Sequence, residues 1–196
     1  MEIVQELEPG DPCLEIPWAS LHNARLRFID LKKIPMKIES LDECRKYPPL
    51  ASLLRLVNAA GSGLRTAKCD VWSTTKLAED ERLEFQMRYK IGSYVDLVFD
   101  HHRLSSRLES HLRLGNKLEE LLSPCRLQAQ IEIAVRRCLF HPKESWGYYL
   151  TIFIHAYGAT RAQAKCEWGR TVGSLEDALS KAGPSFRQKR LKYFRP

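Results

Sequence analysis

The chain has 196 residues, of which 44% are hydrophobic and 28% charged, and it carries a formal net charge of +7. This length and composition suit one globular domain with an ordinary core, and they exclude a wholly disordered chain. No apolar run approaches the roughly 20 residues of a membrane-spanning helix, and the acidic N-terminus lacks a signal-peptide pattern. We therefore expect a cytoplasmic protein that does not bind membranes.

The first third of the chain predicts an irregular segment followed by short helices. Prolines and glycines interrupt the first 20 residues, which indicates an arm laid on the surface. A capping box at 40–43 begins a helix that must end before Pro48. Pro49 fits the first turn of a second helix, which Gly61 closes.

Alternation of apolar and polar residues predicts most of the strands. The pattern covers residues 24–29, 66–71, 83–91, 94–99, 131–135 and 150–157. Gly92-Ser93 stands between two of these runs and fits a two-residue hairpin turn with glycine in first place. We therefore predict a hairpin that joins 83–91 to 94–99.

Apolar residues at helical spacing predict two helices that follow the strands. Leu104, Leu108 and Leu112 start the first, which is expected to break at Gly115-Asn116 and to restart briefly. The second begins with a capping box at 160–163. It buries Trp168 among its apolar positions and stops at Gly183-Pro184.

These elements predict an α+β fold, an antiparallel sheet built from two strand-strand-helix units with helices packed on one face. The stretches that begin at Gly92 and Gly147 support a repeat, because each aligns a glycine, a tyrosine and three inward apolar positions. We expect one domain over 1–183. It comprises an N-terminal helical and irregular segment (1–62) and a sheet-helix core (63–183), and a basic-aromatic tail follows at 184–196.

The sheet face turned away from the helices is the first candidate site. It is expected to display aromatic, basic and hydrogen-bonding side chains, which together resemble a recognition surface. Its candidate residues are Tyr94, Asp96, Arg136, His155 and Tyr157. The alternative is that the N-terminal segment covers this face, which would make Phe153 and Tyr157 a second layer of core.

The C-terminal tail is the second candidate site. Five cations and three aromatic residues lie within residues 186–195, which suits phosphate contacts and base stacking. The residues expected to bind a polyanion are Arg187, Lys189, Arg190, Lys192, Tyr193 and Arg195. The alternative is a solvated tail with an apolar residue or two docked on the body.

No sequence motif predicts catalysis, a metal or a cofactor. The chain lacks a GxSxG elbow, a glycine-rich phosphate loop and an HExxH helix, and its six scattered cysteines are expected to be reduced. Cys138 and His141 have zinc-like spacing without the second pair that a structural site needs. The run 100–102 resembles one motif of the DHH phosphoesterases, but the chain has no aspartate pair at 69–72 to complete such a site.

We therefore expect a non-enzymatic binding protein that engages nucleic acid or a nucleoprotein through a basic surface and its tail. Two alternatives stay open. One is a small-molecule-binding protein or enzyme with a pocket around Tyr94, Asp96, His155 and Tyr157, where Asp96 and His155 would act as an acid–base pair. The other is an adaptor for an acidic protein partner.

Overall fold

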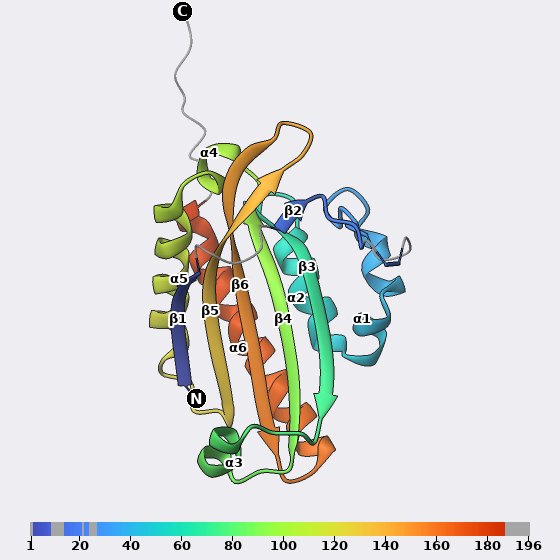
Figure 1. Ribbon diagram of the computed structural model, residues 1–196, viewed down its shortest axis with the longest axis vertical. Helices are drawn as coiled ribbons and strands as arrows, with labels where there is room; N and C mark the ends of the chain where they lie inside the picture. Colours follow the sequence, from blue (N-terminus) through green and yellow to red (C-terminus); the bar gives the residue numbers. More distant parts are fainter. Residues whose placement is uncertain (1, 9–13, 21, 24–26, 187–196) are drawn as a thin grey trace, which may run out of the picture.

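A computed structural model describes residues 2–8, 14–20, 22–23 and 27–186 of the chain (Figure 1). Six strands form one curled sheet in the order β1-β5-β6-β4-β3, and β2 pairs with the far end of β5. The strands are β1 (Glu2–Glu8), β2 (Leu14–Ile16), β3 (Leu64–Thr74), β4 (Tyr89–Phe99), β5 (Ala129–Phe140) and β6 (Ser145–Gly158).

Three helices cover one face of this sheet. They are α2 (Pro48–Asn58), α5 (Leu108–Leu122) and α6 (Arg161–Phe186). Helix α6 crosses β4 and β6 and packs against both of the other two helices (Figure 1). The shorter elements are the 3₁₀ helix η1 (Pro35–Ser40), α1 (Asp42–Lys46), α3 (Glu79–Phe85) and α4 (His102–Ser105).

The predicted α+β class is confirmed, but the sheet is mixed rather than antiparallel. Strands β3, β4, β6 and β5 pair antiparallel, whereas β1 and β2 both run parallel to β5. These two strands replace much of the irregular N-terminal arm that the prolines and glycines suggested. An uncovered edge offers a row of unpaired backbone groups, and the N-terminal segment satisfies those of β5.

The predicted hairpin at Gly92-Ser93 is wrong, because β4 runs through both residues and pairs with β3 and β6. Residues 83–85, expected in a strand, end helix α3, and Gln86 then takes a left-handed conformation with φ 52°. The helix start is stabilised by the Glu81 carboxylate, which accepts a 2.9 Å hydrogen bond from the backbone of Ala78. The two strand-strand-helix units are therefore not confirmed, although β5, β6 and α6 follow one another as expected.

Helix α5 is continuous where a break was predicted. It passes through Gly115, which is buried, and through Asn116, which is exposed. Leu114, Leu118 and Leu122 are all within 1% of complete burial on the same helix. Burial of three such side chains outweighs the roughly 1 kcal/mol that a glycine costs inside a helix.

The predicted helix boundaries hold elsewhere to within a few residues. Helix α1 ends before Pro48, although Ser40 donates its hydroxyl to the Lys37 carbonyl instead of capping the helix. Thr160 does cap α6, since its hydroxyl accepts a 3.1 Å hydrogen bond from the Gln163 backbone. Helix α6 continues past Gly183 and ends at Phe186.

Trp168 lies at the centre of the core between α6 and the sheet, as predicted. Its side chain is 1% exposed, and its indole N–H donates a 2.8 Å hydrogen bond to the Ser93 hydroxyl in the middle of β4. Tyr47, between α1 and α2, packs edge-on against the indole at 5.3 Å between ring centroids. One side chain thus links α6, the sheet and the α1–α2 corner.

Within the described residues, no helix combines the length and hydropathy that crossing a membrane requires. Five cysteines in that part of the chain are free thiols, namely Cys44, Cys69, Cys125, Cys138 and Cys166. Burial raises the pKa of the Cys69 thiol to about 12, so this sulfur is not a thiolate at neutral pH.

Replacing Trp168 with alanine is expected to destabilise the protein by about 3–5 kcal/mol, because a large buried aromatic is lost. Ser93→Ala is expected to cost about 1–3 kcal/mol, since it leaves the buried indole N–H without its acceptor. Urea unfolding measures both. Trp146→Ala is the matched control, because that side chain is 62% exposed. Equal stability of the Trp168 and Trp146 variants would contradict this account of the core.

Candidate functional site

The sheet face opposite the helices is covered at its two ends, and no described helix lies over its centre (Figure 1). At the upper end the β5–β6 hairpin curls over the sheet and buries a small second core with β2. This core contains Ile16, Ala67, Val98, Cys138 and Tyr149. At the lower end α3 lies on the sheet. The centre presents side chains from β3, β4, β5 and β6.

Four aromatic side chains occupy this centre and form a closed ring of contacts, which we call the aromatic patch: Trp72, Tyr94, Phe153 and His155. The centroid of Trp72 lies 6.4 Å from Tyr94 and 6.2 Å from His155, and Phe153 lies 6.0 Å from Tyr94 and 6.3 Å from His155. Trp72 is 36% exposed and the other three side chains are half-buried. Each ring is therefore held by two others while part of it stays open to solvent.

Gly92 creates the position of Trp72. A Cβ atom at Gly92 would stand 2.4 Å from the indole of Trp72, which is far inside contact distance. The tryptophan therefore lies directly over the backbone of the neighbouring strand, and only glycine leaves room for it there.

Two cations border the aromatic patch. The Lys68 ammonium lies 5.8 Å from the Tyr94 ring and 5.2 Å from the ring of Trp18, and the Arg136 guanidinium lies 5.3 Å from Phe153. At these distances both make cation–π contacts. Trp18 is itself fixed by a 2.7 Å hydrogen bond from its indole N–H to the Ala67 carbonyl.

Among the described residues, Asp96 is the one acidic side chain buried on this face, with 5% exposure. Its carboxyl accepts a 2.7 Å hydrogen bond from the Thr151 hydroxyl on β6. Desolvation raises the pKa of Asp96 to about 6, although this hydrogen bond and the charges of Lys68 and Arg136 act in the opposite direction. The same burial, together with the Asp96 charge, raises the pKa of Tyr94.

The structure does not join Asp96 and His155 as an acid–base pair. Asp96 is opposite Thr151 in the register, whereas His155 is opposite Gly92. Four residues along one strand separate the two side chains by about 13 Å. Burial and the Lys90 charge lower the pKa of His155, so its imidazole is neutral at physiological pH.

Tyr157 belongs to the covered lower end rather than to the open centre. It is fully buried, and the ring of Phe85 on α3 stacks on it at 3.8 Å. Its hydroxyl donates a 2.8 Å hydrogen bond to Glu81, which also pairs with Lys90. Burial favours protonation of Glu81, but these hydrogen bonds outweigh it and lower its pKa.

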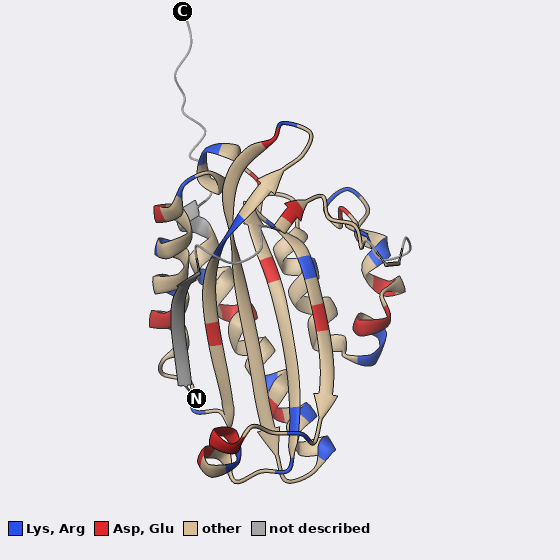
Figure 2. Cartoon of the chain, viewed as in Figure 1, with Lys and Arg blue, Asp and Glu red and all other residues tan. Residues whose placement is uncertain are grey.

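The positive charge of the chain is concentrated outside the described residues. Five of its 31 cations and none of its 24 acidic residues lie in 187–196, so residues 1–186 carry a formal net charge of only +2. The predicted polyanion-binding residues Arg187, Lys189, Arg190, Lys192, Tyr193 and Arg195 all lie in that segment. Figure 2 accordingly shows Lys and Arg interspersed with Asp and Glu over the sheet.

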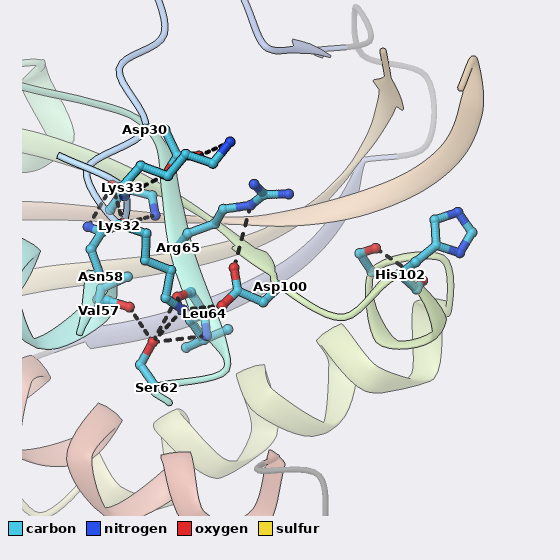
Figure 3. Close-up of polar contacts among 12 residues, drawn as sticks. Asp30, Lys32, Lys33, Val57, Asn58, Ser62, Leu64, Arg65, Asp100 and His102 are labelled. Carbon is cyan, nitrogen blue, oxygen red and sulfur yellow. Dashed lines mark hydrogen bonds and ion pairs between the residues drawn. The ribbon is translucent and has the colours of Figure 1, made fainter. Parts of the chain in front are cut away.

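A second polar cluster ties the N-terminal segment to the ends of β3 and β4 (Figure 3). The Lys32 ammonium donates to the Ser62 hydroxyl at 3.0 Å and to the Leu64 carbonyl at 2.7 Å, and it pairs with Asp100. The Ser62 hydroxyl lies 2.6 Å from the Val57 carbonyl and 2.8 Å from the Leu64 carbonyl, and it can donate its single proton to either. We interpret this cluster as a structural clamp.

The other sequence candidates for metal binding are dispersed. Asp100 contacts Lys32 and Arg65, while the ring of His101 accepts a hydrogen bond from the Arg103 backbone at the start of α4. His141 lies 3.4 Å from Glu15, and Cys138 is buried in the second core. In the described part of the chain, no three His, Cys, Asp or Glu side chains are grouped to hold a metal ion.

Sequence reasoning placed Tyr94, Asp96, Arg136, Phe153 and His155 on one face, and the register puts them there. It missed Lys68 and Trp72. Both have the same parity in the alternating pattern of residues 66–71 and its continuation, and this pattern was the available signal. Comparisons with protein-family models, with curated proteins and with solved structures find no match to this chain.

Replacing Asp96 with asparagine tests the buried carboxyl. The pKa of Asp96 is higher in the folded state than its ordinary value of about 3.9, so the folded state retains the proton as pH rises. Stability should therefore fall between about pH 4 and pH 6 and stay low above that range. Asp96→Asn should remove this loss and gain about 2–3 kcal/mol at pH 7.5. Denaturant midpoints at pH 4.5 and 7.5 measure it, and a variant with the wild-type pH profile would refute the assignment.

Proposed function

We propose that the protein is a non-enzymatic binding protein that takes single-stranded nucleic acid on its aromatic patch. The observation that supports this most strongly is the closed ring of Trp72, Tyr94, Phe153 and His155 at the centre of a sheet face, where no described helix lies over it. Unpaired bases stack on such rings, and stacking tolerates any base because each has a π-face. Lys68 and Arg136 stand at the border, where a phosphate backbone would pass.

In this proposal, two parts of the chain contribute to the free energy of binding, namely the sheet face and residues 187–196. The sheet face mixes Lys68 and Arg136 with acidic residues such as Asp70 and Asp96, so its attraction comes from stacking more than from charge. The segment 187–196 supplies five cations without an acidic residue, and its attraction is electrostatic and independent of sequence. Removing one part should leave the contribution of the other intact.

Trp72→Ala is expected to weaken binding of a labelled single-stranded oligonucleotide by about 1–3 kcal/mol, the usual worth of one base stacked on an aromatic ring. Gly92→Val should weaken it similarly, because the added side chain displaces the Trp72 indole. Fluorescence anisotropy measures both, and Trp146→Ala, at an exposed tryptophan on the hairpin, is the matched control. Unchanged affinity in both patch variants would refute the role of the aromatic patch.

Deleting residues 187–196 leaves helix α6 intact and removes five cations. Each lost phosphate contact should flatten the dependence of log affinity on log salt by about 0.7, and up to about 3.5 in total. The same anisotropy assay at several salt concentrations measures this slope. Equal salt slopes for the full-length and the truncated chain would show that residues 187–196 do not contact the oligonucleotide. Tighter binding of an acidic peptide than of any oligonucleotide would favour the adaptor alternative.

A further inference from the structure

A hollow with a volume of about 330 Å³ lies at the lower ends of β3 and β4, beside the start of α6. Lys76, Lys90 and Arg161 line it, together with the three consecutive hydroxyl residues Ser73, Thr74 and Thr75. No acidic residue is among its lining residues. In Figure 2, Lys and Arg segments gather around this end of the two strands.

The cations of this hollow are only partly neutralised. Lys90 pairs with Glu81 of α3. Lys76 and Arg161 are exposed, and neither has an ion-pair partner among the described residues. Like charges that share one hollow repel each other, so the arrangement costs energy unless an anion occupies it.

The chemistry of the hollow suits a phosphate group. Arginine and lysine donate charge-assisted hydrogen bonds to phosphate oxygens, and hydroxyl groups supply further donors. The Thr74 hydroxyl already accepts a 2.9 Å hydrogen bond from the Lys76 backbone, which fixes the turn that brings Lys76 back toward the strand end. Thr74 is opposite Lys90 in the register, so hydroxyl and amine come from neighbouring strands.

The hollow is also next to the aromatic patch. Thr74, which lines the hollow, follows Trp72 by two residues and therefore lies on the same face of β3, about 7 Å further along the strand. A nucleotide whose base stacks on Trp72 would therefore have its phosphate near the hollow.

We propose that this hollow is a phosphate-binding site that holds the phosphate of a nucleotide whose base stacks on Trp72. That the phosphate belongs to a nucleotide rests on the proposed function, whereas the affinity of the hollow for phosphate does not.

The test compares the full-length chain with two double variants in calorimetric titrations at low salt. Lys76→Gln with Arg161→Gln removes the two unpaired cations, and Arg113→Gln with Lys181→Gln removes two exposed cations on other surfaces as a control. The probes are inorganic phosphate, adenosine 5′-monophosphate and adenosine. Wild type and control are expected to bind the monophosphate about tenfold or more tightly than adenosine, since hydrogen bonds to charged groups are the strong ones. The Lys76/Arg161 variant should lose this preference and its affinity for inorganic phosphate.

The outcomes separate the two proposals. No binding of phosphate or monophosphate at millimolar concentration, or equal binding by both double variants, would overturn the phosphate site. Loss of adenosine stacking in Trp72→Ala with phosphate affinity intact is expected if both proposals hold. Binding of phosphate without binding of any oligonucleotide would refute the proposed function, but it would support the phosphate site. A preference for an acidic peptide over phosphate would reject the phosphate site.

Discussion

Two small neighbouring residues in the middle of β4 determine how both layers of this protein are placed. On the helix face, the Ser93 hydroxyl accepts the indole N–H of Trp168, the largest fully buried side chain of the core. On the other face, Gly92 leaves room for the indole of Trp72. Helix α6 and the aromatic patch are thus positioned through adjacent residues of the same strand. Any larger residue at Gly92 would move the patch without touching the core, whereas a change at Ser93 acts on the core first.

Gly92 and Ser93 also explain why the local sequence pattern predicted a hairpin that does not exist. A glycine followed by serine between two alternating runs is the ordinary pattern of a hairpin turn. The physical demand for small residues comes instead from Trp72 and Trp168, which lie on other elements and are distant from β4 in sequence. Where the pattern was purely local it predicted well, as in β6 and in the Thr160 cap of α6. The parallel pairing of β1 with β5 has no local signature, because it depends on an edge that exists only in the folded sheet.

The candidate site shows the same division between local and non-local information. Alternation along β4 and β6 suffices to place Tyr94, Phe153 and His155 on one face, since side chains in a strand change face at every residue. It does not reveal that α3 covers Tyr157, because the alternation at residues 83–85 predicts a strand. Nor does it separate Asp96 from His155, because the distance between them depends on the register of two strands rather than on their faces.

The geometry of the patch bears on how tightly it could bind with so little charge around it. Each ring already contacts two others, so a ligand that stacks on them orders few additional side chains. Pre-ordering of this kind lowers the entropic cost of association. Asp96 adds to the rigidity, since its hydrogen bond with Thr151 ties the two central strands beneath the patch. Under the proposed function, the face would select planar groups by shape and contact, and the electrostatic attraction for a polyanion would come from the five cations of residues 187–196.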